Sequence, residues 1–264
     1  MNMQSDVYFD LDKAPMAVSS VTLTVHGLDR MVEFYTRVIG LSVHHRDEQA
    51  AMLGAEAPFL NLVSDPEAAR ANPHAPGLFH VAYLLPSRED LVSWLGHVAN
   101  TKLRLAGASD HNVSEAVYLQ DPEGNGIEIY ADRAVRNWTD ADGALQMPSK
   151  PLDLSGLPDP QVWSGAPAKT RIGHVHLQTT EIPASEAFWT GLGMEIMARY
   201  PDGSFFGSGG YHHQIAANVW NSRGQPVQTG VKTGLRELTL AVDPAVVEAP
   251  QTHISPSGAV SYTH

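Results

Sequence analysis

Apolar and polar residues alternate along positions 18–25, a pattern that favours a β-strand with one buried face. Residues 28–39 then carry apolar side chains at helical spacing. A second strand-like run, 79–85, leads into a helical segment from about residue 89 to residue 98, with Ser87 as the expected N-cap. Each stretch therefore predicts a strand followed by a helix.

Two further strand-like runs, 116–119 and 126–130, flank the turn sequence Asp121-Pro122-Glu123-Gly124-Asn125. Proline, glycine and asparagine each favour the backbone angles of a tight turn. We therefore expect the two runs to pair as a β-hairpin that follows the second helix.

The unit is repeated in the second half of the chain. Residues 20–23 (SVTL) match residues 174–177 (HVHL), and residues 77–80 (GLFH) match residues 234–237 (GLRE) at almost the same offset. An internal repeat of this kind indicates that the fold is built from repeated structural units. The sequence predicts an α+β fold of four strand–helix–strand modules, the fourth of them truncated.

The repeat divides the chain into three parts. Modules one and two are expected in residues 16–133, and module three with the truncated module four in residues 171–264. Residues 134–170 hold several prolines and scattered glycines, which are typical of an extended connector.

Three polar side chains fall on similar faces of three predicted strands, because side chains alternate across a strand. His174 falls on the face of Ile172, His80 falls opposite Phe79, and Glu128 falls opposite the neighbouring isoleucines. A lone histidine on a strand is usually a hydrogen-bonded structural residue. Two histidines and one carboxylate on equivalent faces of a repeated module indicate instead a facial triad, the ligand set of non-haem Fe(II) oxygenases.

The composition limits the partners. The 264 residues carry 17 Lys+Arg against 29 Asp+Glu, so the net charge is −12, and we expect no nucleic-acid or membrane partner. Cysteine is absent, which excludes disulfides and thiolate catalysis. We find no signal-peptide pattern in residues 1–13 and expect a cytoplasmic protein. Strand edges left unpaired by the truncated module would favour a homo-oligomer.

Several motifs resemble those of the vicinal oxygen chelate superfamily, which includes glyoxalase I, bleomycin-resistance proteins and extradiol dioxygenases. They lie in residues 172–177 (IGHVHL), 188–190 (FWT) and 121–130 (DPEGNGIEIY). Residues 110–118 (DHNVSEAVY) and 209–213 (GGYHH) are similar to those of bacterial catechol 2,3-dioxygenases. The resemblance implies βαβββ-type modules that form paired open-cup mixed sheets.

The resemblance also implies an oxidoreductase of aromatic compound catabolism, in which Fe(II) serves the cleavage of an aromatic diol by O2. By this resemblance His80, His174 and Glu128 would match the metal ligands. His213 would match a histidine that transfers protons, on a strand whose opposite face carries His212.

His111 and Tyr118 would match the residues that contact the substrate. In the family's four-module enzymes the last two modules form the site, whereas here the matching residues lie in modules two and three. Only the pairing of these two modules unites all the ligands in one cup. We therefore expect Nε2 of His80 and Nε2 of His174 to lie about 3 Å apart, if both bind one ion.

Two other functions stay open. One is a glyoxalase-type isomerase or lyase with Zn or Ni, in which His213 would supply a fourth ligand; Mn is a further alternative to Fe(II). The other is a non-enzymatic protein that binds a planar ligand in the cup, which a truncated module four would permit.

Overall fold

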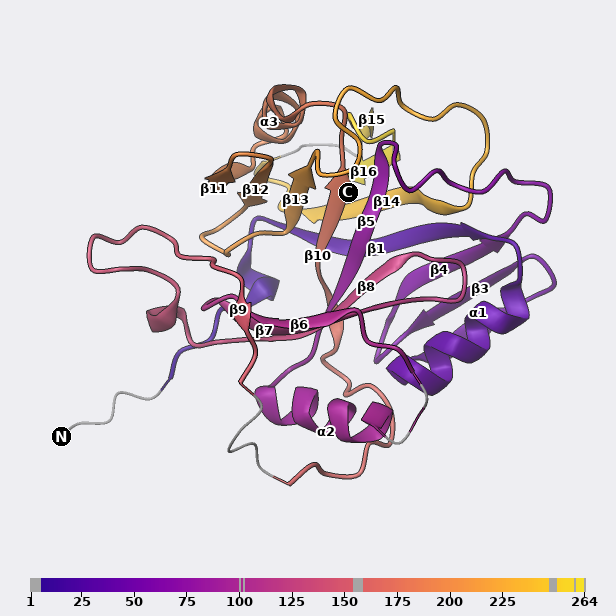
Figure 1. Ribbon diagram of the computed structural model, residues 1–264, viewed down its shortest axis with the longest axis horizontal. Helices are drawn as coiled ribbons and strands as arrows, with labels where there is room; N and C mark the ends of the chain where they lie inside the picture. Colours follow the sequence, from indigo (N-terminus) through magenta and orange to yellow (C-terminus); the bar gives the residue numbers. More distant parts are fainter. Residues whose placement is uncertain are drawn as a thin grey trace.

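The computed structural model describes residues 6–99, 101, 103–153, 159–246, 251–258 and 260–263 (Figure 1). Positions 154–158 of the expected connector, and positions 247–250, 259 and 264 of the expected fourth module, thus lie outside the described residues. Strands dominate, which confirms the α+β class. The helical elements of the described part are α1 (Leu28–Phe34), η2 (Tyr35–Ile39), α2 (Arg88–Ala99), α3 (Ile182–Gly191) and the short turns η1 (Leu11–Lys13) and η3 (Val135–Asn137).

One sheet combines modules one and four, in the strand order β15-β16-β14-β1-β4-β3-β2. Its central pair, β1 and β14, runs antiparallel. The strands are β1 (Met16–Val25), β2 (Ser42–Arg46), β3 (Ala50–Gly54), β4 (Pro58–Ser64), β14 (Gly234–Val242), β15 (Gln251–Ile254) and β16 (Val260–Thr263).

The second sheet combines modules three and two, in the order β11-β12-β13-β10-β5-β8-β7-β6-β9. Its central strands β10 and β5 are also antiparallel, so the strand order agrees with the expected pairing of modules two and three. The strands are β5 (Gly77–Leu84), β6 (Gly107–Asp110), β7 (Ser114–Gln120), β8 (Gly126–Asp132), β9 (Lys150–Pro151), β10 (Arg171–Gln178), β11 (Glu195–Tyr200), β12 (Gly203–Gly207) and β13 (Ile215–Asn218).

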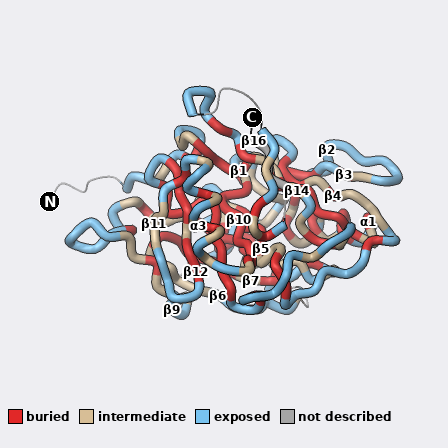
Figure 2. The backbone as a smooth tube through the Cα atoms, turned by 90° about the horizontal axis from the view of Figure 1, so that it is seen from above, coloured by how far each residue is buried: buried red, intermediate tan, exposed pale blue. Residues whose placement is uncertain are grey.

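A single large apolar cluster joins the two sheets and the helices. It includes Leu23 of β1, Val175 of β10, Trp94 of α2 and Trp189 of α3, all at most 1% exposed. Figure 2 shows the buried residues running through the strands at the centre, with the exposed loops around them. Burial of these side chains is the main stabilising contribution to the fold.

Two β-bulges in the β5–β10 pair change which side chains face the site. On β10, Gly173 has no partner in the register, between Ile172 and His174. On β5, Phe79 has no partner, because His80 pairs with His176 and Leu78 pairs with Leu177. The prediction that Ile172 shares the face of His174 is therefore wrong, because Ile172 packs into the main core. Phe79, expected opposite His80, instead has its ring 5.0 Å from the ring of His176, because a bulge places two successive residues opposite one.

Gly173 allows a tyrosine to pack directly against β10. A Cβ added at Gly173 would lie 1.7 Å from Oη of Tyr130, which no real side chain tolerates. Tyr130 is fully buried and its hydroxyl lies 2.8 Å from the hydroxyl of Tyr211. The glycine at the bulge therefore lets Tyr130 lie beside His174, with ring centroids 5.0 Å apart.

The local predictions around α2 and the hairpin are confirmed. The Ser87 hydroxyl accepts the N–H of Asp90 at 3.1 Å, as an N-cap does. Strands β7 and β8 pair antiparallel across the expected turn. Asp121 in this turn accepts a hydrogen bond from the hydroxyl of Tyr35 at 3.1 Å, which ties the turn to module one. Among the described residues, no helix is long and apolar enough to cross a membrane.

Candidate active site

The three predicted metal ligands meet at one buried point of the second sheet. His80 comes from β5, Glu128 from β8 and His174 from β10. Nε2 of His80 lies 3.3 Å from Nε2 of His174. Oε2 of Glu128 lies 3.0 Å from Nε2 of His80 and 3.3 Å from Nε2 of His174. Strands that are neighbours in the sheet but distant in the sequence thus bring three donor atoms together.

The donor set fits a divalent metal ion. Two ligands that each lie about 2.0–2.2 Å from one ion are separated by roughly 3 Å, close to the separations seen here. Nδ1 of His174 is buried and has no hydrogen-bond partner, so Nε2 is the nitrogen of that ring engaged in the cluster. Within the described part of the chain, these three residues form the cluster of potential ligands.

Electrostatics favour the protonation states that a metal ligand needs. Burial acts to raise the pKa of Glu128, but His174 and His80 together hold that pKa well below its usual value. Burial lowers the pKa of His174, although Glu128 opposes the shift. An ionised carboxylate and a neutral imidazole are the forms that bind a cation.

His213 lies beside the cluster, but in a loop and not on a strand. Its ring centroid is 4.2 Å from that of His174, and residues 208–214 connect β12 to β13. The expectation that His212 and His213 occupy opposite faces of a strand is therefore wrong. Nδ1 of His212 lies 2.8 Å from Nδ1 of His213, so the two rings form a pair.

A carboxylate orients this pair. Nε2 of His212 lies 2.9 Å from Oδ1 of Asp132, which can only accept a hydrogen bond when ionised. With His212 neutral, its Nδ1 then accepts from Nδ1–H of His213. This arrangement leaves Nε2 of His213 as an acceptor. Burial, followed by the neighbouring histidines, lowers the pKa of His213 well below its usual value, which keeps the ring neutral.

Asp132 and His212 were missed from the sequence as members of the site. The signal that could have identified Asp132 is its position on β8, on the same strand face as Glu128 by the alternation of side chains. His212 could not be assigned, because the backbone from residue 208 to residue 214 does not alternate as a strand does.

His111 and Tyr118 form a second hydrogen-bonded pair. Nε2 of His111 lies 2.7 Å from the Tyr118 hydroxyl, and Nδ1 of His111 lies 2.8 Å from the carbonyl oxygen of Pro148. A carbonyl only accepts, so Nδ1 of His111 carries the proton and Nε2 accepts from Tyr118. Burial and then Glu128 raise the pKa of Tyr118 well above its usual value, so its hydroxyl stays protonated. Pro148 belongs to the connector, so the connector determines which ring nitrogen of His111 carries the proton.

A cavity of about 640 Å³ brings all six predicted site residues together. Its further lining includes aromatic side chains that the sequence did not identify, namely Phe79, Tyr200, Phe205 and Trp220. This volume lies within the range of about 300–1,000 Å³ that is typical of small-molecule sites. The cavity can hold an organic ligand directly beside the three potential metal ligands.

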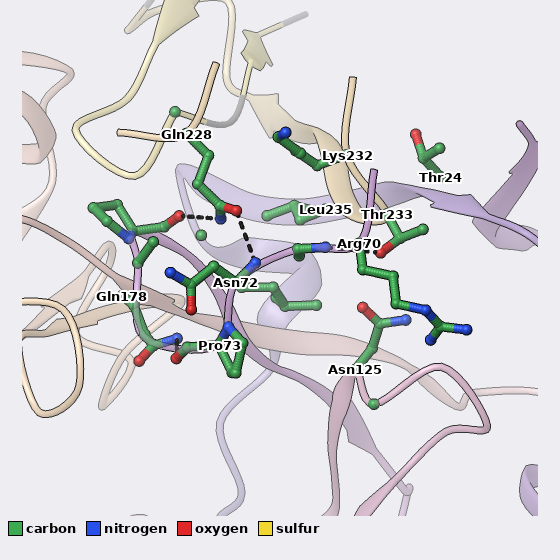
Figure 3. A pocket seen from close by; sticks show the side chains of 18 of the residues that line it. Thr24, Arg70, Asn72, Pro73, Asn125, Gln178, Gln228, Lys232, Thr233 and Leu235 are labelled. Atoms are coloured by element: carbon green, nitrogen blue, oxygen red, sulfur yellow. Dashed lines mark hydrogen bonds between the residues drawn. The ribbon is translucent and has the colours of Figure 1, made fainter. Parts of the chain in front are cut away.

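A second cavity, of about 760 Å³, opens near the ends of β5, β10 and β14 (Figure 3). Its wall is mixed, and its polar side chains include Arg70, Lys232 and Gln178. Gln228 closes one side, because its Oε1 accepts the N–H of Asn72 at 2.8 Å. The two cavities share Phe79 and Gln120 in their walls, but the potential ligand cluster lines only the smaller one.

Comparisons with known proteins agree with this geometry. Residues 17–129 match the family model of the Glyoxalase/Bleomycin resistance protein/Dioxygenase superfamily. The chain is 36% identical over 235 residues to the Catechol-2,3-dioxygenase of Bacillus subtilis (strain 168). The aligned region covers 83% of this chain and 80% of that protein.

Solved structures share the fold at low sequence identity. A Bacillus subtilis structure assigned provisionally as a dioxygenase superposes with a TM-score of 0.62 and 12% identity, over 94% of this chain and 84% of that one. Glyoxalase I from Zea mays gives a TM-score of 0.57 and 12% identity, over 94% and 92%. The length and identity of the sequence match show that the chain belongs to the Glyoxalase/Bleomycin resistance protein/Dioxygenase superfamily.

Proposed function

We propose that this protein is a metal-dependent extradiol dioxygenase that cleaves an aromatic diol with O2. The observation that carries the proposal is the convergence of His80, Glu128 and His174 beside a cavity of ligand size. Two imidazoles and one carboxylate leave adjacent positions of an ion open, and this set is typical of non-haem Fe(II) oxygenases. The similarity to a Catechol-2,3-dioxygenase supports a diol as the substrate.

In the proposed reaction a carbon–carbon bond beside the diol breaks and both atoms of O2 enter the product. The ring-opened product of catechol carries one aldehyde, one carboxylic acid and the second diol oxygen as an enol, so its four oxygen atoms and the electrons balance without a further reductant. Fe(II) held by His80, Glu128 and His174 would supply the binding of the diol oxygens and the activation of O2.

The side chains around the ion would handle protons and orientation. Nε2 of His213 is an acceptor and can take a proton from a diol hydroxyl, because Asp132 and His212 hold the opposite nitrogen. The Tyr118 hydroxyl, held by His111, would orient the diol at the inner end of the cavity. A substrate packed against the aromatic wall would exclude water from the reacting atoms.

The test is anaerobic loading with Fe(II), followed by catechol and then O2. The proposal predicts a yellow ring-opened semialdehyde and consumption of one O2 per diol. The absence of this product from a broad panel of diols, together with tight Zn or Ni binding, would favour the glyoxalase-type alternative. The absence of any bound metal would favour the non-enzymatic binding protein.

The geometry favours the dioxygenase over the isomerase. The described cluster contains three ligand residues and does not include His213, whose Nδ1 pairs with Nδ1 of His212. A glyoxalase-type site would need a fourth protein ligand. The cytoplasmic location and the homo-oligomer expected from the sequence stay predictions.

A further inference from the structure

The wall of the smaller cavity carries no cation. Among the described residues that line it there is no lysine or arginine, and the single carboxylate is Glu128. The second cavity differs, since Arg70 and Lys232 line it (Figure 3). Glu128 and a diol bound as a monoanion would already balance the two charges of a bound Fe(II) ion. A further carboxylate on the ligand would therefore lose its water with no lysine or arginine in this wall to pair with it, which is unfavourable.

Aromatic rings form the outer part of this wall. The ring of Trp220 lies 5.2 Å from that of Phe79 and 5.3 Å from that of His176, both edge-on. Tyr200 and Phe205 continue the wall, with centroids 5.5 Å apart. Offset and edge-on contacts of this kind stabilise a bound aromatic group beyond the burial of its surface. The cavity therefore offers an apolar region next to the diol position.

Trp220 is held in place, although it is not buried. Trp220 is 53% exposed, and its backbone N–H donates to Oδ1 of Asn218 at 3.0 Å. The amide of Asn218 donates to Nε2 of His176 at 2.9 Å. Asn218 itself is fully buried. The hydrogen bonds hold the backbone of Trp220, and its ring packs against Phe79 and His176. A ligand that covers this exposed apolar ring would remove apolar surface from water, which favours binding.

We infer that the cavity selects uncharged aromatic diols that carry an apolar substituent, with Trp220 as the residue that determines this specificity. The inference rests on the proposed function for the presence of the diol. The chemistry at the metal would fix the two hydroxyl groups. The substituent would then pack against Trp220 and Phe79, where no lysine or arginine lines the cavity to pair with a carboxylate.

The test measures binding separately from turnover. The Fe(II)-loaded protein is titrated without O2 by calorimetry with 3-phenylcatechol, catechol and 2,3-dihydroxybenzoate. We expect 3-phenylcatechol to bind at least about tenfold more tightly than 2,3-dihydroxybenzoate, the lower end of what one apolar group is worth in a fitted pocket. Equal or tighter binding of 2,3-dihydroxybenzoate would overturn the inference.

Two variants of Trp220 test the role of the residue. Trp220→Ala should weaken the binding of 3-phenylcatechol by roughly tenfold, since a lost aromatic contact and its buried area are worth about this much. The affinity for catechol should stay within about twofold of the wild-type value. Trp220→Arg should strengthen the binding of 2,3-dihydroxybenzoate, because the guanidinium group can pair with the carboxylate of this ligand. Tyr8→Ala is the matched control, because Tyr8 is 55% exposed and does not line the cavity. Equal loss for catechol and 3-phenylcatechol in Trp220→Ala would overturn the specificity role.

Admission of O2 separates this inference from the proposed function. Binding with the expected preference but without a ring-opened product would overturn the proposed reaction and leave the specificity of the cavity in place. Ring cleavage of 2,3-dihydroxybenzoate as efficient as that of 3-phenylcatechol would overturn the specificity and leave the reaction in place.

Discussion

Nε2 of His80 lies 3.3 Å from Nε2 of His174, although 94 residues separate them in the sequence. The contact exists because β5 and β10 pair antiparallel at the centre of one sheet, so modules from the two halves share one cup. Neither half of the chain holds both histidines. The candidate site is therefore a property of the assembled chain.

The first prediction concerns His213. His213→Phe should keep the bound iron but lower kcat by about 10²–10⁴, the usual worth of general acid–base catalysis. The reason is that Nε2 of His213 is the free acceptor of the Asp132–His212–His213 chain. Iron content and kcat are measured together. His212→Phe is not a neutral control, because Nδ1 of His212 contacts His213. The control is His45→Phe, since His45 is exposed. Loss of iron in His213→Phe would make His213 a ligand.

The second prediction concerns Tyr118. Tyr118→Phe removes the hydroxyl that donates a hydrogen bond to Nε2 of His111 at 2.7 Å, but it keeps the ring in the cavity wall. We expect KM for the diol to rise severalfold with a smaller change in kcat, because the hydroxyl orients the substrate and does not carry the chemistry. Steady-state kinetics at saturating O2 give both constants. A loss confined to kcat would assign Tyr118 a role in proton transfer instead.

The third prediction concerns the packing at Gly173. Gly173→Ala should lower the free energy of unfolding by about 1–3 kcal/mol, the usual cost of overpacking, because its Cβ would overlap the Tyr130 hydroxyl. Gly191→Ala, at the end of α3 with no atom within 4 Å of the added Cβ, should be neutral or stabilising. Urea unfolding of both variants measures this. Equal stability would mean that β10 and Tyr130 are not in close contact.

The fourth prediction concerns pH. Burial lowers the pKa of His176 and of His213 well below the usual value. In the unfolded chain these rings titrate near about 6.5, so the unfolded state takes up protons first as the pH falls. The metal-free protein should thus be most stable above this pH and lose stability as the pH falls towards the folded-state pKa values.

Urea midpoints of the metal-free protein at about pH 7.5 and about pH 5.5 test the sign of this linkage. His176→Gln should reduce the difference between the two midpoints, because glutamine cannot titrate. A midpoint that rises on acidification would show that the buried rings are already charged in the folded protein.

Much of the fold follows from local patterns in the sequence. The Ser87 cap, α2 and the β7–β8 hairpin lie where turn chemistry and periodicity predicted them, since these depend on neighbouring residues. The bulges at Gly173 and Phe79 could not be predicted, because a strand's register is set by its partner. The loop conformation at His212 and His213 depends in the same way on Asp132, which is 80 residues away.

The central claim is that His80, Glu128 and His174 bind one metal ion, and iron content after anaerobic loading tests it most directly. We predict about one Fe(II) per chain in the wild-type protein and little in His80→Ala, Glu128→Ala or His174→Ala, because three ligands leave none to spare. His45→Ala, at an exposed histidine, should retain the wild-type content. Full iron content in any of the three variants would show that its residue is not a ligand and contradict the account.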